Sequence, residues 1–125
     1  MPDTLSSVDQ RLLREIRGSW TSDTSYDPDL WSDDNPAWGQ CAITALVVQD
    51  HLGGELLRAG NGEITHFWNS IDGHEIDLTS EQFSAIPAWT TGPELVTRDY
   101  VLAWPATRSR YEALRSRVTR ALSFR

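Results

Sequence analysis

The sequence predicts an α+β fold in which an apolar central helix packs on a small antiparallel sheet, with further helices toward the N- and C-terminal ends. Three observations predict this fold. Apolar residues recur at helical spacing near both ends. The stretch 41–51 is apolar nearly all round, which is typical of a buried helix. Short strand-like runs separated by Gly-containing turns follow it. The 125 residues, 39% of them hydrophobic, suffice for one domain over residues 1–125.

The two outer helices are predicted from stripes of apolar residues. The first is expected over 5–17, ended by Gly18, and the last over 107–123, where Ser109 and Glu112 fit a capping box. The stripes consist of Leu5, Val8, Leu12 and Ile16 in the first helix and Tyr111, Leu114, Val118 and Leu122 in the last.

Short strands are expected between the central and the last helix. Gly53-Gly54 ends the central helix, because glycine adopts the left-handed conformation found at helix ends. A short helical turn is expected after Thr79 or Ser80, and residues 84–97 read as irregular because they contain two prolines. The expected strands cover 55–59, 63–69, 73–78 and 100–103.

The segment 19–39 is expected to be an ordered loop, because its four aromatic residues make it too apolar for a disordered linker. Loops of this length are uncommon in compact domains and are often functional.

Composition points to a protein of a reducing compartment. The single cysteine cannot form an internal disulfide, no stretch approaches a membrane span, and the first residues lack the basic and apolar regions of a signal peptide. We therefore expect a cytoplasmic protein without membrane contact.

Charge is unevenly distributed along the chain. The net charge is −7, but residues 98–125 hold seven arginines and two acidic residues. A basic helix face that balances an acidic body is the favoured interpretation over a surface for nucleic acid or an acidic partner.

Cys41 is the most informative residue, because it stands where a Pro/Gly loop turns into the central helix. The first N–H groups of a helix are unpaired and carry partial positive charge, which favours a thiolate. The position therefore indicates a nucleophile.

A histidine and an aspartate are predicted to lie together across the hairpin 65–79. If Asp72-Gly73 form a two-residue turn, His66 lies diagonal to Asp77; in a four-residue loop the two residues face each other. In either register His66, Trp68, Glu75 and Asp77 share one polar face, which we expect to border a cleft or solvent. Phe67, Ile76 and Leu78 share the opposite, core-facing side.

Cys41, His66 and Asp77 supply the three groups of a nucleophilic site: a thiol, its base, and a group that orients the base. The Cys41 backbone N–H, helped by Gln40, is a candidate donor to a developing oxyanion. Trp38 and Trp68 are candidate substrate-binding residues, because each is close in sequence to a catalytic candidate.

Several further motifs run along the chain: Asn35-Pro36 with Gly39-Gln40-Cys41, Thr44–Asp50 with Gly53-Gly54, His66–Asn69, and Ile76–Thr79 with Gln82-Phe83, together with Gly18–Trp20, Trp31 and Arg110-Tyr111 with Leu114. These motifs resemble those of the YunG-like family of small bacterial proteins. The order Cys, His, Asp also resembles the papain-like and transglutaminase-like superfamily. That resemblance implies a papain-like domain and acyl transfer through a thioester, on a small-molecule or peptide-like substrate and without a cofactor. The glutamine stands directly before Cys41, unlike in papain, where it lies several residues upstream.

Two other functions compete with a cysteine enzyme. The chain could be a binding or regulatory domain that uses its acidic body or its arginine-rich last helix. It could also hold a metal ion on Cys41, His66 and Asp77, although no closely spaced ligand pair supports this.

Overall fold

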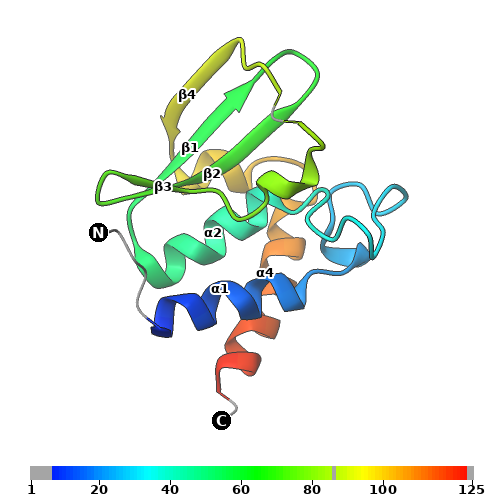
Figure 1. Ribbon diagram of the computed structural model, residues 1–125, viewed down its shortest axis with the longest axis vertical. Helices are drawn as coiled ribbons and strands as arrows, with labels where there is room; N and C mark the ends of the chain where they lie inside the picture. The colour runs from blue at the N-terminus through cyan, green and yellow to red at the C-terminus, as the bar shows by residue number, and fades with distance from the viewer. Residues whose placement is uncertain (1–6, 86, 124–125) are drawn as a thin grey trace.

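The computed structural model describes residues 7–85 and 87–123 and has four α-helices, two 3-10 helices and four strands within that range (Figure 1). In chain order they are α1 (Ser7–Ser19), η1 (Ser22–Thr24), α2 (Cys41–Leu52), β1 (Glu55–Gly60), β2 (Thr65–Ile71), β3 (His74–Ile76), η2 (Ser80–Gln82), β4 (Thr91–Val96), α3 (Arg98–Leu102) and α4 (Thr107–Leu122).

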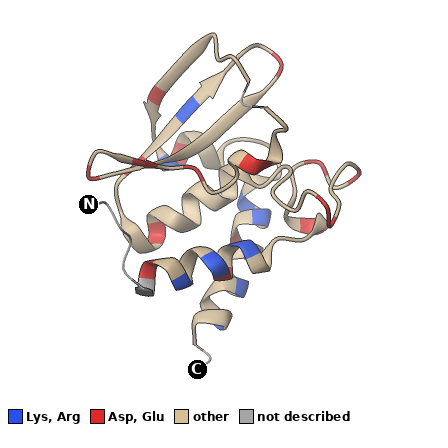
Figure 2. Cartoon of the chain, viewed as in Figure 1, with Lys and Arg blue, Asp and Glu red and all other residues tan. Residues whose placement is uncertain are grey.

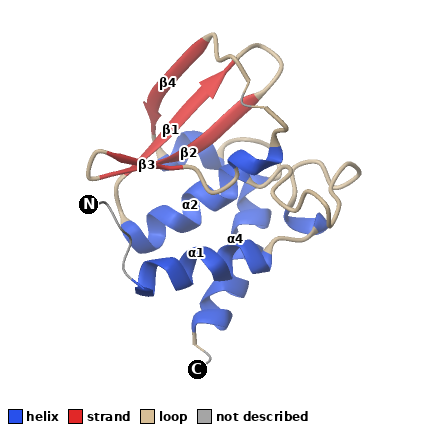
Figure 3. Ribbon diagram, viewed as in Figure 1, coloured by secondary structure: helices blue, strands red, loops and turns tan. Residues whose placement is uncertain are grey.

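The strands form one antiparallel sheet in the order β3-β2-β1-β4, and the long helices lie on one side of it (Figure 3). Helix α2 packs directly on β2 and β1, while α4 packs on α2, and α1 contacts α4 and α2. This arrangement confirms the predicted α+β class, with a central helix on a small antiparallel sheet.

Helix α2 forms the centre of the core. Every residue from 42 to 48 is buried, which explains why its sequence shows no polar face. Its burial between the sheet and α4 stabilises the position of the first turn. The helix begins at Cys41, as predicted, and ends at Leu52. Its C-cap Gly53 has a φ of 73° and a ψ of −150°, a backbone conformation that favours glycine but differs from the expected left-handed helical one.

Two sequence predictions about residues 84–103 are wrong. Thr91–Val96 is strand β4 rather than irregular chain, and Pro93 is tolerated there because β4 lies at the edge of the sheet. Residues 100–103 lie in and just after helix α3 rather than in a strand. The Thr97 side chain accepts a hydrogen bond from the Tyr100 N–H at 3.1 Å, so Thr97 caps this short helix.

The boundaries of the outer helices differ slightly from prediction. Helix α1 continues past Gly18 to Ser19. Its buried residues include Leu12 and Ile16, as expected, while Leu5 and the side chain of Val8 lie outside what the structure describes. The capping box at the start of α4 is wrong, because Ala106 is the N-cap and the Ser109 hydroxyl donates to the Ala106 carbonyl at 3.4 Å.

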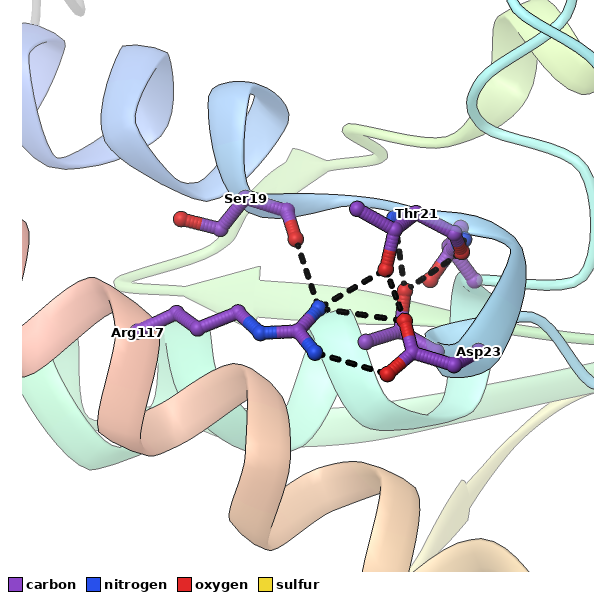
Figure 4. A network of polar contacts seen from close by, with 6 residues as sticks. Ser19, Thr21, Asp23 and Arg117 are labelled. Atoms are coloured by element: carbon purple, nitrogen blue, oxygen red, sulfur yellow. Dashed lines mark hydrogen bonds and ion pairs between the residues drawn. The ribbon is translucent and has the colours of Figure 1, made fainter.

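The segment 20–40 is fastened at several points, as predicted for an ordered loop. Trp20 is buried and donates through Nε1 to the Thr44 hydroxyl of α2 at 2.9 Å. At the far side, Arg117 of α4 reaches across to Ser19, Thr21 and Asp23 (Figure 4). The loop is thereby held against the N-terminal end of α2, where Cys41 lies.

The arginines of the described chain gather mainly on α1 and α4, while acidic residues are spread over the loops and element ends (Figure 2). Among the arginines after residue 97 that the structure describes, three contact the body of the protein: Arg98 pairs with Asp50 at 3.1 Å, Arg117 pairs with Asp23, and Arg110 is buried.

Candidate active site

Cys41 begins helix α2 at the wall of a cavity of about 320 Å³. Its thiol is free and half-buried. Because the first N–H groups of a helix have no intrahelical partner, the positive end of the α2 dipole lies at the wall of this cavity. Other residues that line the cavity are Trp38, Gly39, Gln82, Phe83 and Arg110.

Gly39 allows the loop to approach the start of α2. Its φ is 75°, and a Cβ atom at this position would collide with the Ser25 hydroxyl and lie 2.8 Å from the Tyr26 backbone nitrogen. The same nitrogen donates to the Gly39 carbonyl at 2.8 Å. Only glycine therefore fits here without displacing the loop.

The hairpin has the predicted two-residue turn. Ile71 pairs with His74, and the turn residues Asp72 and Gly73 have φ values of 52° and 83°, as a type I′ turn requires. This register places Asp77 diagonal to His66. The His66 Nε2 and an Asp77 carboxylate oxygen are 2.7 Å apart.

The prediction that His66 shares one face with Trp68 and Glu75 is confirmed. The Trp68 Nε1 donates to Glu75 at 2.8 Å, and the Trp68 ring stacks on His66 with centroids 5.3 Å apart. The expectation that this face borders a cleft or solvent is wrong for His66, which is only 2% exposed. The rings of Phe83 and Trp89 cover it at centroid distances of 5.2 and 5.8 Å.

His66 interacts with both Asp77 and Cys41. Because a carboxylate only accepts hydrogen bonds, Nε2 carries the proton shared with Asp77, and Cys41 is near enough to affect the pKa of the imidazole. Burial lowers the pKa of His66, but the hydrogen bond to Asp77 and the electrostatic interactions with Cys41 and Asp77 outweigh it, so that the pKa of His66 rises to about 9. The imidazole is therefore cationic at neutral pH.

Gln40, the candidate oxyanion donor, and Gln82 occupy different places. The Gln40 side chain is fully buried and donates to the Thr21 carbonyl at 3.1 Å, so its amide nitrogen is used in holding the loop. The Gln82 side chain lines the cavity instead. Its Nε2 lies 3.5 Å from the His66 Nδ1, and its Oε1 accepts from the Gly39 N–H at 3.3 Å.

The contact between Gln82 and His66 is the weaker of the contacts that His66 makes. An amide nitrogen is a donor, so this contact favours a neutral Nδ1, whereas Asp77 and Cys41 favour the cation. The bond to Asp77 is 0.8 Å shorter, and the Gln82 Nε2 also donates to the Thr79 hydroxyl at 3.3 Å. We therefore assign the cationic imidazole.

The two candidate substrate-binding tryptophans, Trp38 and Trp68, lie in different places. Trp38 lines the cavity beside Cys41, with its Nε1 3.5 Å from an Asp27 carboxylate oxygen. Trp68 is outside the cavity wall and belongs to a small apolar cluster with Leu57 and Ala59 on the outer face of the sheet. Trp68 thus supports His66, while Trp38 is placed to contact a ligand.

Gln82 and Arg110 are cavity residues that the sequence analysis named within family motifs but did not select as site residues. Gln82 follows Asp77 within the helical turn that starts after Thr79, so its closeness to His66 depends on a turn geometry that the residue pattern alone does not give. Arg110 is one of many arginines in the sequence, and only its burial distinguishes it.

Two further searches cover the described residues. Within residues 7–85 and 87–123, no three His, Cys, Asp or Glu side chains are grouped so that they could hold a metal ion. Over the same part of the chain, no helix has the length and apolar character needed to cross a membrane.

The fold and the site define a small α+β domain with a half-buried cysteine at the start of its central helix and a buried histidine that is paired with a half-buried aspartate. The family model described as YunG protein matches residues 8–123, so the chain belongs to the YunG family. It is 44% identical over 70 residues to the uncharacterized protein YunG of Bacillus subtilis (strain 168), a match that covers 56% of this chain and 58% of that protein. No solved structure matches the chain.

Proposed function

We propose that the protein is a cysteine-dependent acyl-transfer enzyme, an amidase, peptidase, other hydrolase or acyltransferase that acts through a thioester on Cys41. One observation carries the proposal: His66 is hydrogen-bonded to Asp77 and interacts electrostatically with Cys41, and Cys41 opens on a cavity. A thiol, a base and an orienting carboxylate in contact are what nucleophilic acyl transfer requires.

In the proposed reaction the Cys41 sulfur attacks the carbonyl carbon of an ester, thioester or amide. A carbon–sulfur bond forms as the carbonyl π pair moves onto oxygen. When this intermediate collapses, the bond to the leaving group breaks and His66 gives the leaving group its proton. Water or another acceptor then attacks the thioester, passes a proton to His66 and releases the sulfur.

Asp77 serves as the orienting group in this proposal. Its short bond to Nε2 fixes the orientation of the imidazole, and it stabilises the cation that forms. The stacked rings of Trp68 and Trp89 prevent the imidazole from turning away.

For the oxyanion we propose the Cys41 backbone N–H and the Gln82 side-chain amide. Both belong to residues of the cavity wall, and Gln82 is also tied to the loop through the Gly39 N–H. The burial of Gln40 gives no support to its expected role as a donor.

The wider similarity to papain-like and transglutaminase-like enzymes is part of this proposal. It is supported by the chain order Cys, His, Asp and by a cysteine-bearing helix packed on an antiparallel sheet. Cytoplasmic location likewise stays a proposal based on the single free cysteine.

The chemistry is tested with p-nitrophenyl acetate and mass spectrometry of the intact protein. We expect a burst of p-nitrophenolate and one acetyl group on Cys41, with no acetylation in Cys41→Ala. His66→Ala should lower the acylation rate by a factor of about 10² or more. The matched control is His51→Ala, an exposed histidine at the other end of α2.

The activation of the thiol is tested by iodoacetamide labelling across pH. A free thiol titrates at about 8.5, so unactivated labelling falls steeply below that pH. We expect labelling of the wild-type protein to stay fast at neutral pH, and that of His66→Ala to require more alkaline solution. Identical profiles for both proteins, without acetylation, would contradict the enzyme and leave a binding domain as the explanation.

A further inference from the structure

Arg110 places a buried positive charge in the wall of the cavity that holds Cys41. The residue lies in the first turns of α4 and is 9% exposed. A buried charge is unfavourable unless it is paired, so its retention in a cavity wall calls for an explanation.

The hydrogen-bond partners of Arg110 are all neutral. Its Nε donates to the Ala106 carbonyl at 3.1 Å, and Nη1 donates to the carbonyls of Thr24 at 3.0 Å and Gly39 at 3.5 Å. Its Nη2 donates to the Thr107 hydroxyl at 3.4 Å. Within the described residues no carboxylate oxygen lies within 4.0 Å of the guanidinium, so these bonds satisfy its hydrogens without neutralising its charge.

The guanidinium also keeps capacity for a ligand. An arginine has five N–H donors, and the bonds above use four of them, which leaves one at Nη2. The Tyr26 ring lies 5.5 Å from the guanidinium carbon, and burial lowers the pKa of Arg110 while the nearby charge of Cys41 opposes this. Arg110 and Cys41 thus interact electrostatically across the same cavity.

Two carboxylates border the cavity as well. Asp27 is half-buried and 3.5 Å from the Trp38 Nε1, and Glu63 is exposed. Because both are more exposed than Arg110 and neither pairs with it, their charges are better screened by water. The buried part of the cavity therefore favours an anion.

We propose that Arg110 selects acyl substrates that carry a carboxylate close to the reacting carbonyl group. This inference rests on the proposed function, because it concerns what reaches the Cys41 sulfur. Arg110 binds the carboxylate through Nη2, and the aromatic side chains of Trp38, Phe83 and Trp104 contact the apolar part of the substrate.

The selectivity is measured with two alkylating agents of similar size and different charge, iodoacetate and iodoacetamide. In both reactions the Cys41 sulfur forms a bond to the CH₂ carbon, the carbon–iodine bond breaks, and iodide leaves. The ratio of the two rates is divided by the same ratio for 2-mercaptoethanol, a neutral thiol. We expect this normalised ratio to favour iodoacetate by roughly tenfold in the wild-type protein, against the repulsion of its net charge of −7.

Arg110→Met should bring the normalised ratio to one or below, while Arg115→Met, which removes an exposed charge from the same helix, should leave it unchanged. Arg110→Lys keeps the charge but not the set of carbonyl bonds, so it should retain most of the preference. A merely structural Arg110 would give the same ratio in the wild-type protein and all three variants.

The wild-type protein provides a second readout if Arg110→Met does not fold. Added sodium chloride should lower the normalised ratio toward one while leaving the iodoacetamide rate nearly constant. A wild-type ratio of one or less, together with His66-dependent iodoacetamide labelling, would overturn the anion selectivity and keep the proposed enzyme. Labelling that does not depend on His66 would overturn the enzyme instead.

Discussion

Two arginines of helix α4 hold the same loop in different ways. Arg117 forms an ion pair with Asp23 at 2.7 Å, and the two side chains are 37% and 64% exposed. Arg110 is buried and bonds the loop only through the carbonyls of Thr24 and Gly39. The two residues are seven positions apart, about two helical turns, so they project from the same side of α4.

The difference shows how one residue type can serve two purposes on one helix face. At Arg117 the charge is neutralised by a carboxylate and screened by water, so this end of the helix fastens the loop and does little else. At Arg110 the acceptors are neutral, so the same kind of attachment leaves a positive charge beside Cys41. The inner end of α4 therefore couples the structure of the loop to the chemistry of the cavity.

The largest effect is expected at Gly39. Its carbonyl accepts a hydrogen bond from Arg110, and it lies two residues before Cys41. Gly39→Ala introduces a Cβ atom against the Ser25 hydroxyl and the Tyr26 nitrogen, at a φ of 75°. We expect unfolding free energy to fall by about 2–4 kcal/mol in urea denaturation, and labelling of Cys41 to slow. The control is Gly18→Ala in α1, where a Cβ atom meets nothing within 4 Å and helix propensity predicts a gain of about 0.5–1 kcal/mol. A Gly39→Ala protein as stable as wild type would contradict this prediction, because it would show that the loop accommodates the added Cβ atom without loss of stability.

The pH dependence of stability should distinguish the site around His66 from the ion pair between Asp23 and Arg117. Folding raises the pKa of His66 and lowers the pKa of Asp23. The pKa of His66 is raised in the folded protein from 6.5 to about 9, so its stabilisation is complete below pH 6.5 and is lost as the pH rises to about 9. This loss is at most about 3 kcal/mol. The pKa of Asp23 is lowered to about 2, chiefly by its hydrogen bond to Arg117, so its smaller contribution is present above about pH 4 and is lost as the pH falls.

Urea denaturation from pH 3 to pH 9.5 measures both losses. His66→Gln should flatten the alkaline side of the stability profile, and Asp23→Asn should flatten the acidic side only slightly, because this ion pair is exposed. An alkaline decline that survives His66→Gln would mean that other groups determine it.

The sequence predicted the central features of the site because they depend on local periodicity and turn chemistry. Asp72-Gly73 favours a two-residue turn, and this turn alone determines that His66 lies diagonal to Asp77. The start of α2 at Cys41 follows in the same way from the Pro/Gly loop and the apolar run after it.

The failures share a different cause, since they depend on contacts between distant segments. The enclosure of His66 comes from Phe83 and Trp89, in a stretch that has no periodic pattern. The burial of Arg110 depends on how α4 meets the loop 86 residues earlier in the chain. Strand β4 was not predicted because it contains Pro93. An edge strand tolerates proline, because the backbone N–H groups on its outer side need no partner strand.

Replacing Arg110 or Arg117 by methionine, one at a time, should give the smallest changes in stability and compares the two arginines most directly. Arg110→Met leaves the Thr24 carbonyl without its donor and removes the longer of the two bonds to the Gly39 carbonyl, which keeps the Tyr26 N–H. We therefore expect a loss of about 2 kcal/mol in unfolding free energy, reduced because a charge is no longer buried. Arg117→Met should lose less than about 1 kcal/mol of unfolding free energy, because its ion pair is exposed.

Urea denaturation in low and in high salt measures the unfolding free energy of both variants. Salt should reduce the difference between wild type and Arg117→Met and leave that for Arg110→Met unchanged, since only the first interaction joins two exposed charges. If the two variants lost the same stability with the same salt dependence, the distinction between a fastening arginine and a charge-bearing one would fail.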